Sequence, residues 1–546
     1  MGLFIRKPME LLRLEAREQG SRSLRRVLGP VALVALGVGV VVGAGLFSIT
    51  GLVAANYSGP AITLSFMIAA LCCCFAGLCY AEFASMIPVA GSAYTYSYAT
   101  MGELVAWIIG WDLVLEYSVA ASMLSISWSR YAVKFLGDLG WTLPDALTAC
   151  PWDGGVLNLP AALIVVLMSL FVIRGTRQSA VFNAFIVCLK IGVILLFVLL
   201  GWKYINTDNY HPYIPQNTGR FGEFGWSGVM RGAAIVFFAF LGFDSVSTMA
   251  QETHNPRRNM PLGILGSLAV VLVLYLAFSY VMTGVANYRL FGGQDGLAPV
   301  AVAISQMGAA GPDGVVQPAY PWLNKAILLA ILLGYCSVIL VQLLAQSRVF
   351  MSMSRDGLLP PFFSKIHPRF RTPVHNNVLF MVAVSLLAAL VPAEVAGEMT
   401  SIGTLFAFIL VCGGVLIVRR TMPAREGAFR VPLVPLVPIL GILSCFAVMV
   451  SLPPDTWIRL IIWMLLGLDV YVGYGMRHSR LEPGGARRGQ SVLNTVGMAV
   501  SVLCCLSGLW HQQAAGWDAD KGLLAVAAVC GVAHLAFYLL RIGRRR

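Results

Sequence analysis

Long apolar stretches alternate with short polar segments along nearly the whole chain. Each of fourteen such stretches comes close to the ~20 residues that an α-helix needs to cross the hydrocarbon core of a bilayer. The pattern predicts an all-α integral membrane protein with about 14 transmembrane helices. These helices are expected to be centred near Val40, Leu71, Leu115, Val165, Leu195, Val236, Leu274, Leu340, Leu386, Ala407, Leu443, Leu465, Leu503 and Ala528.

Composition indicates the same class of protein. Of the 546 residues, 58% are apolar and 12% are charged, whereas a soluble domain carries roughly a quarter of its residues as charged side chains. The twelve cysteines lack the paired spacing of a metal site, and most lie inside apolar stretches. We interpret them as small buried apolar side chains.

The basic residues are distributed unevenly when the chain is threaded alternately through a membrane. With the N-terminus inside, 28 of the 38 Lys and Arg residues fall in cytoplasmic segments, which is the positive-inside pattern. We therefore expect both termini in the cytoplasm. The net charge of +13 then reflects topology and anionic lipid, and it does not indicate nucleic acid binding.

The N-terminal segment does not have the features of a cleaved signal peptide. About thirty residues of mixed charge precede the first apolar stretch, and no small-residue cleavage site follows a short apolar run. We therefore expect this stretch to be retained as a membrane span. The segment from Met9 to Arg26 is interpreted as a solvated run of charges, with an amphipathic interfacial helix as the alternative.

Two predicted spans contain helix-breaking sequences. The first span carries glycines at Gly37, Gly39, Gly43 and Gly45, and the sixth contains FFAFLGFD, which begins at Phe237 and includes Gly242 and Asp244. These spans occupy equivalent positions in a repeat of five plus five helices, and matched broken helices indicate a transporter binding site. A mid-membrane break frees amides and carbonyls that lipid cannot satisfy. The alternative is that each glycine only permits close helix packing.

Lys190 is the single charge in the apolar run Val181–Leu200. A charge at the bilayer centre costs at least about 2.5–3.5 kcal/mol, so the ammonium group must lose its proton, meet a carboxylate or bind backbone carbonyls. If it loses its proton near neutral pH, it becomes a proton carrier. The alternative is snorkelling to the interface, which is disfavoured by a depth of roughly three helical turns from Ala180.

Four further acidic residues in the predicted spans stand out. Glu116 and Asp112 lie four residues apart in WDLVLEY, so both carboxylates share one helix face and are able to bind a cationic group. Asp244 follows the break in the sixth span, where it either caps the next half-helix or contacts ligand. Glu82 is interpreted as structural. The seven histidines have no metal-ligand spacing, and no phosphate-binding loop or nucleophile elbow is present, so we expect neither an enzyme nor a metal site.

Four segments resemble the amino acid, polyamine and organocation (APC) superfamily, and within it the cationic amino acid transporter family, over about the first 430 residues. They are GVGVVVGAGLF from Gly37, YAEFASMIPVAGSAYTYSYATMGELVAWIIGWDLVLEY from Tyr80, FFAFLGFDSVSTMAQETHNPRRNMP from Phe237, and QSRVFMSMSRDGLLP from Gln346 followed by HPRFRTPVHNN from His367.

This resemblance implies a LeuT-like fold of two inverted five-helix repeats in a bacterial cytoplasmic (inner) membrane, carrying L-amino acids by alternating access. It implies a cytoplasmic tail (1–28), a transport core (29–420, with repeats 29–203 and 228–420) and four additional C-terminal helices (421–546). The last two of these helices, after Arg488, are expected to serve packing or contact with an unidentified membrane partner. The alternatives are an exchanger of polyamines or other organic cations and a non-transporting amino-acid sensor; a membrane enzyme is a more distant one.

The resemblance also implies roles for individual residues. Proton coupling is expected at Lys190, which looks like a lysine found where sodium-dependent relatives hold a cation, so sodium and other cofactors are not expected. Glu116 and Asp244 are expected to face the substrate side chain, and one of Tyr335 to Ser337, for which we take Ser337, is expected to line the same region. The substrate carboxylate and ammonium groups are expected to bind the backbone of Gly43, Ala44 and Gly45 and of Phe237, Phe238, Ala239 and Phe240, with Phe238 and Phe240 occluding the pocket.

Overall fold

The computed structural model describes residues 4–17, 26–43, 45–138, 140–292, 299–310, 316–421, 428–450, 452, 454–481, 493–506 and 521–543. The first half of the chain forms α1 (Met9–Arg17), α2 (Pro30–Val41), η2 (Gly45–Ile49), α3 (Thr50–Val53), η3 (Ala54–Ser58), η4 (Gly59–Ala61), α4 (Ile62–Met86), α5 (Ala93–Thr100), α6 (Glu103–Asp138), η5 (Asp145–Leu147), η6 (Pro151–Asp153), α7 (Leu159–Arg174), α8 (Thr176–Trp202) and η7 (Thr207–Tyr210).

The second half continues with α9 (Gly225–Val236), η8 (Phe237–Phe240), η9 (Phe243–Glu252), α10 (Pro256–Val285), η10 (Tyr288–Gly292), α11 (Pro299–Ser305), α12 (Pro321–Arg355), η12 (Pro361–Ser364), α13 (Val374–Leu390), α14 (Ala393–Thr421), α15 (Leu436–Val450), α16 (Pro454–Val470), η13 (Tyr471–Gly475), α17 (Met476–His478) and α19 (Lys521–Gly543). The short strands β1 (Gly308–Ala310) and β2 (Val316–Pro318) pair antiparallel.

The helices match the predicted spans closely. All fourteen predicted centres fall inside apolar helices of the described chain, of which eight are long and apolar enough to cross a membrane. The other six, among them Leu493–Leu506 and Ala527–Leu539, have 10–17 residues. The all-α membrane class is therefore confirmed, and the count of 14 transmembrane helices stays a prediction.

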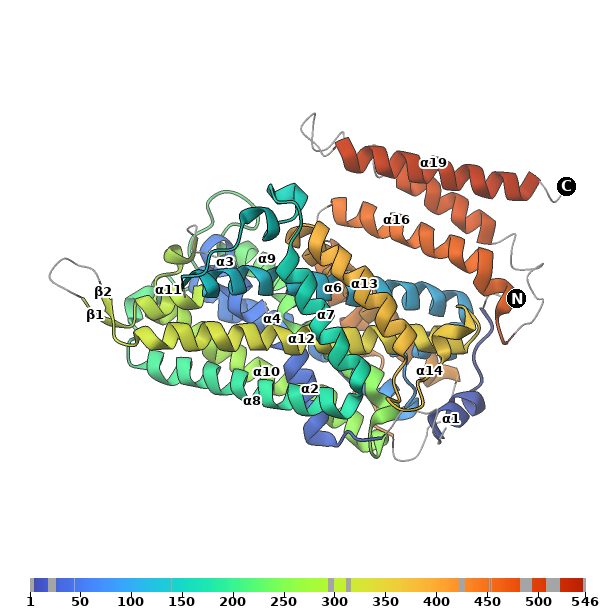
Figure 1. Ribbon diagram of the computed structural model, residues 1–546, viewed down its shortest axis with the longest axis horizontal. Coiled ribbons are helices and arrows are strands. Elements are labelled where there is room, and N and C mark those ends of the chain that lie inside the picture. The colour runs from blue at the N-terminus through green and yellow to red at the C-terminus, as the bar shows by residue number, and fades with distance from the viewer. Residues whose placement is uncertain are drawn as a thin grey trace.

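The long helices form one bundle, with the β1–β2 hairpin at one end and α1 at the other (Figure 1). We call these the hairpin end and the α1 end. Helix α4 packs on α10, α6 packs on α12 and α14, and α2 lies against α8, α10 and α12. Helices α16 and α19 run along one side of the bundle, away from α8 and α10 (Figure 1).

Helix α16 is joined to α6 by indole hydrogen bonds. Trp107 of α6 donates through Nε1 to the Gly467 carbonyl at 2.9 Å, and Trp111 donates to the Trp463 carbonyl at 2.9 Å. The rings of Trp111 and Trp463 stack with centroids 4.7 Å apart. A buried indole N–H needs such an acceptor, so α16 is fixed against α6 at this level of the bundle.

The N-terminal segment is ordered against the bundle over residues 4–17, which corrects its interpretation as a solvated run of charges. Residues 9–17 form α1, and Leu12 is buried. The amide of Glu103 donates to the Ile5 carbonyl at 3.1 Å, and Lys7 forms a buried ion pair with Asp356. The sequence around Lys7 does not predict this ion pair, because Asp356 lies almost 350 positions away in the chain. Residues 18–25 lie outside the described chain.

Both predicted helix breaks are present. The first helix stops at Val41 and resumes at Gly45 as a π-helical turn that leads into α3 and η3. The sixth span changes from α9 to the 3₁₀ turn η8, passes through extended Leu241 and left-handed Gly242 (φ 103°), and resumes as η9. Only glycine adopts this φ without a steric penalty, so the position of the second break follows from Gly242.

Candidate functional site

The two helix breaks touch each other in the middle of the bundle. A Cβ atom built on Gly45 would lie 2.3 Å from Cα of Ala239, and one built on Gly242 would lie 2.7 Å from Cγ2 of Val40. Side chains at either glycine would therefore collide with the opposite segment. The glycines therefore permit close packing of the two segments at this crossing, and the binding site that the matched breaks indicate stays a prediction.

Tyr275 of α10 joins the two breaks through one hydroxyl group. Its oxygen lies 2.8 Å from the Val41 carbonyl and 2.9 Å from the Ala239 carbonyl. Its ring packs between Phe66 and Phe240, with both centroid separations at 5.2 Å. The carbonyls that helix termination leaves without intrahelical donors are thus partly satisfied by a side chain from a third helix.

Lys190 binds backbone carbonyls, which was one of the three alternatives for its buried charge. Its ammonium nitrogen lies 2.9 Å from the Gly39 carbonyl and 2.6 Å from the Val42 carbonyl, at the end of α2. The side chain is fully buried, so it does not snorkel to an interface. A Cβ on Gly334 of α12 would come within 2.8 Å of its Cε atom, which shows how tightly the lysine stem is enclosed.

Buried carboxylates and tyrosines gather beside the second break. Tyr117 of α6 donates to Oδ2 of Asp244 at 2.7 Å, and Glu116, Asp244 and Tyr80 interact electrostatically. Within the described chain, Oδ1 of Asp244, Oε2 of Glu116 and the Tyr80 hydroxyl have no hydrogen-bond partner. We call Tyr80, Glu116, Tyr117 and Asp244 the carboxylate cluster. Because buried polar atoms are rarely left unsatisfied, this cluster is suited to binding a polar or cationic ligand group.

Asp112 shares the α6 face of Glu116, as the four-residue spacing predicts, but it faces a different neighbour. A Cβ on Gly403 of α14 would lie 3.1 Å from its Oδ1. Asp112 is fully buried, and neither of its carboxylate oxygens meets a donor among the described residues. Asp244 is the second residue of η9, and its two candidate roles, capping this helix and contacting ligand, both stay predictions.

The remaining predicted site residues lie either at the crossing of the two breaks or on the Lys190 side of α2. Phe237 and Phe240 are buried and pack on Phe408 and Phe66 respectively, and Phe238 is half-buried. The Phe238 carbonyl accepts from the Leu241 amide at 3.2 Å. Ser337 donates to the Gly39 carbonyl at 3.1 Å, on the Lys190 side of α2. Gly43 and Gly45 line the first break, and Ala44 lies outside the described residues.

Glu82 is structural, as predicted. Its Oε2 accepts from Arg419 at 2.8 Å and from the Val431 amide at 2.7 Å. It therefore connects α4 to the end of α14 and the segment before α15, away from both breaks.

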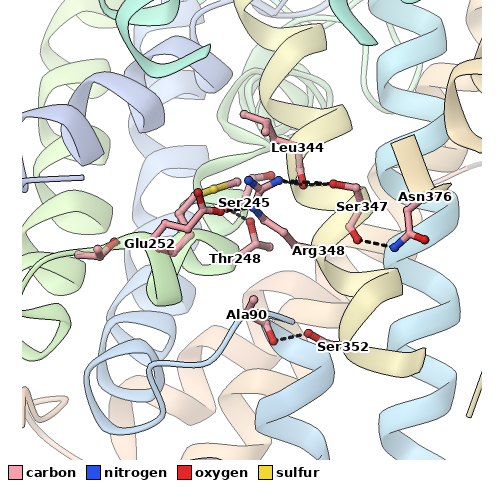
Figure 2. Close-up of polar contacts among 11 residues, drawn as sticks. Ala90, Ser245, Thr248, Glu252, Leu344, Ser347, Arg348, Ser352 and Asn376 are labelled. Carbon is pink, nitrogen blue, oxygen red and sulfur yellow. Dashed lines mark hydrogen bonds and ion pairs between the residues drawn. The ribbon is translucent and has the colours of Figure 1, made fainter. Parts of the chain in front are cut away.

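A buried ion pair joins α12 to the end of η9 (Figure 2). Arg348 of α12 pairs with Glu252, the last residue of η9, and both side chains are almost fully buried. The same guanidinium donates to the Leu344 carbonyl at 2.9 Å. The Glu252 carbonyl in turn accepts from the amides of Val27 and Leu28 at 2.9 and 3.0 Å, so the entry to α2, the end of η9 and α12 are held together.

A further layer of polar contacts lies at the α1 end itself. Asp356 accepts from Tyr94 at 2.7 Å and pairs with Lys7. Glu103 accepts from Tyr98 at 2.6 Å and from Tyr471 at 2.8 Å. The N-terminal segment, the end of α12, the start of α6 and the start of η13 are therefore joined at this end of the bundle.

Comparison with known proteins agrees with this architecture. The family model described as amino acid permease matches residues 28–468. The methylthioribose transporter of Bacillus subtilis is 42% identical over 88% of this chain and 99% of its own length. The branched-chain amino acid permease BcaP of the same organism is 42% identical over 86% and 97% of the two chains. The vacuolar cationic amino acid transporter 4 of Arabidopsis thaliana is 34% identical over 77% and 68%.

These relatives are named as permeases and transporters, and the model match includes both helix breaks, Lys190 and the carboxylate cluster. The protein is therefore a multi-pass membrane transport protein and not an enzyme, and the chain belongs to the amino acid permease family of the APC superfamily.

Proposed function

We propose that this protein is a secondary active transporter that imports L-amino acids across a bacterial cytoplasmic membrane by alternating access, coupled to protons. The observation that carries the proposal is the position of Lys190, whose ammonium group holds the carbonyls of Gly39 and Val42 at the first break. A charged donor makes a hydrogen bond roughly twice as strong as a neutral one. Loss of the proton therefore loosens α2 from α8, and proton binding is coupled to the conformation of the break.

The substrate site lies at the crossing of the two breaks. In our proposal the carboxylate of the amino acid meets amides near Gly43 and Gly45, where the helical segment 45–58 begins, because a helix N-terminus favours an anion. The ammonium group meets carbonyls at the end of η8. The substrate side chain extends toward Glu116 and Asp244, whose unpaired oxygens supply acceptors.

The α1 end faces the cytoplasm in this proposal, so both termini are cytoplasmic. The Arg348–Glu252 pair and the Lys7–Asp356 pair then close the cytoplasmic side, and import requires this side to open after substrate has entered. Because the ammonium group of Lys190 occupies the two carbonyls, sodium is not expected to bind between them.

A second candidate substrate is a neutral thioether sugar of the methylthioribose type. Two observations favour it, namely the 42% identity to the methylthioribose transporter of Bacillus subtilis and the unpaired polar atoms of Tyr80, Glu116 and Asp244. Hydroxyl groups both donate and accept hydrogen bonds, so a sugar satisfies such a set as well as a cationic side chain does.

The test is thermal stabilisation of the purified protein by each L-amino acid, several polyamines and methylthioribose at acid and neutral pH, followed by uptake into proteoliposomes. Stabilisation by amino acids together with uptake driven by an acid exterior is the expected result. Stabilisation by methylthioribose alone would select the second candidate. Substrate-for-substrate exchange with no net uptake under a pH gradient would indicate an exchanger, and binding without flux a sensor, and either result would overturn proton-coupled import.

A further inference from the structure

Two uncharged side chains lie close to Gly39, whose carbonyl Lys190 binds. Asn183 of α8 precedes Lys190 by seven residues, which is about two helical turns, and it is fully buried. Its amide nitrogen donates to the Ala35 carbonyl of α2 at 3.2 Å. Ser337 of α12 is also fully buried and contacts the amide oxygen of Asn183. A Cβ on Gly39 would collide with both side chains.

The carbonyl of Gly39 is shared between two donors. It accepts from Lys190 at 2.9 Å and from the Ser337 hydroxyl at 3.1 Å. Serine has a single hydroxyl proton, and the amide oxygen of Asn183 lies within reach of the same hydroxyl. Asn183 and Gly39 therefore compete for this proton. The amide nitrogen of Asn183 is committed to Ala35, which keeps its oxygen directed at Ser337.

We propose that Asn183 is a positioning residue that draws the Ser337 hydroxyl proton away from the Gly39 carbonyl and keeps this carbonyl available to the ammonium group of Lys190. The proposal rests on the proposed function, in which Lys190 carries the coupling proton. It assigns to Asn183 and Ser337 opposite effects on that proton. Asn183 favours the charged lysine, and Ser337 opposes it by competing for the same carbonyl.

Few other groups are placed to set the charge of Lys190. Helix α2 has no titratable side chain, and α7 has only Arg174, at its last residue. From α12, the Cys336 thiol lies near the lysine and hydrogen-bonds to the Leu332 carbonyl at 3.3 Å. From α10, the Tyr275 hydroxyl is occupied by Val41 and Ala239. The other titratable residues of α10 and α12 are Arg257, Arg258, Tyr280, Lys325, Tyr335, Arg348 and Arg355.

The experiment is the dependence of amino-acid uptake on external pH, measured with the full-length protein in proteoliposomes. Uptake that needs a protonated Lys190 is present below a midpoint pH and is lost above it. Asn183→Ala leaves Ser337 with Gly39 as its acceptor, so the midpoint is expected to move to lower pH. Ser337→Ala frees the Gly39 carbonyl for Lys190, so the midpoint is expected to move to higher pH. Each shift is expected to be about 0.5–1 pH unit, a three- to tenfold change in proton affinity.

Two control variants remove similar groups elsewhere. Asn376 of α13 is equally buried and donates its amide to the Ser347 carbonyl of α12 at 3.1 Å. Ser125 of α6 donates to the Ala121 carbonyl at 2.7 Å. Neither contacts Lys190 in the described chain. Asn376→Ala and Ser125→Ala are therefore expected to leave the midpoint unchanged, even where they lower stability.

The outcomes separate this inference from the function on which it rests. A pH-independent wild-type uptake would overturn both. A pH-dependent wild type with midpoints that shift in the same direction, or not at all, in the two variants would overturn the inference alone. If Asn183→Ala does not fold, Ser337→Ala still decides the matter, because it retains the Asn183–Ala35 hydrogen bond and must by itself move the midpoint to higher pH.

Discussion

Gly45 and Ala239 are in direct backbone contact, since a methyl group added to Gly45 would lie only 2.3 Å from Cα of Ala239. Each residue belongs to one of the two interrupted helices. Real Cβ atoms do not approach other atoms so closely, and the Cα atom of Ala239 belongs to backbone that cannot rotate aside. The two breaks are therefore held together as one unit, and a movement of either helix segment displaces the other.

Gly45→Ala is expected to abolish uptake and to destabilise the protein by about 1–3 kcal/mol, the usual cost of overpacking a close contact. The added methyl group must push η2 away from η8, which separates the backbone groups proposed to bind substrate. Substrate-induced thermal stabilisation and liposome uptake measure the two effects.

The matched control is Gly192→Ala. Gly192 lies in α8, and a Cβ built there has no atom within 4 Å. Because alanine favours the helix over glycine by about 0.5–1 kcal/mol, this variant is expected to retain uptake and to gain slightly in stability. Equal uptake and equal stability of Gly45→Ala and Gly192→Ala would show that the contact at Gly45 is not important.

Lys190→Ala is expected to reduce uptake driven by an acid exterior about tenfold or more while substrate binding remains measurable. The variant loses two hydrogen bonds from a charged group, each worth about 1.5–3 kcal/mol, but it retains the backbone of both breaks. Uptake against external pH and substrate-induced stabilisation are measured on the same preparation. Lys325→Ala, at an exposed position of α12, is the control. Normal pH-dependent uptake by the alanine variant at position 190 would remove the lysine from the coupling mechanism.

The parts of the site that were predictable are those with a local signal. Glycines and FFAFLGFD locate both helix breaks, since a broken helix needs residues that tolerate unusual φ or close approach. Lys190 was noticeable because a charge in an apolar run is costly. Which of the three alternatives for its ammonium group applies was not predictable, because the Gly39 and Val42 carbonyls lie about 150 residues away in sequence.

Residues without a local signal were missed. Tyr275 is one of the 18 tyrosines and sits in an ordinary apolar helix, yet its hydroxyl joins both breaks. Arg348 has no local signal that predicts its burial, although it is fully buried inside α12. Its partner, Glu252, is 96 residues away. Such pairings depend on the tertiary arrangement of helices, which periodicity within one helix does not encode.

Glu116→Gln is expected to change the choice of substrate more than the stability of the fold. Glutamine retains the size of the side chain and replaces a carboxyl group next to Asp244 with an amide, which cannot ionise. Binding of amino acids with cationic side chains is expected to weaken about tenfold, the equivalent of about 1.4 kcal/mol, while neutral amino acids are affected less. Competition assays with lysine, arginine and leucine measure the ratio. An equal loss for all three would argue against a contact between Glu116 and the substrate side chain.

Breaking the Arg348–Glu252 pair is expected to be strongly destabilising. Arg348→Met leaves the Glu252 carboxylate buried without its cation, which costs about 3–5 kcal/mol in comparable pairs. The double variant Arg348→Met, Glu252→Leu removes both charges and is expected to recover most of the loss in thermal stability. Asp153→Asn, which removes the exposed pair between Arg130 and Asp153 at 3.9 Å, serves as a control with less than about 1 kcal/mol expected. A single variant as stable as the wild type would contradict the structural importance of the buried pair.

Tyr275→Phe is expected to lower stability by about 1–3 kcal/mol and to slow substrate exchange. The phenyl ring retains its packing on Phe66 and Phe240, so the change isolates the hydroxyl that joins the Val41 and Ala239 carbonyls. Leaving buried carbonyls without a donor carries a cost of this size. Tyr280→Phe, on the same helix at a position that is 37% exposed, is the control and is expected to behave as wild type. Substrate exchange requires both breaks to move but needs no net proton transfer. A loss of exchange in Tyr275→Phe alone would therefore identify the hydroxyl as the mechanical link between the two breaks. Unchanged exchange would show that the Gly45–Ala239 contact is sufficient.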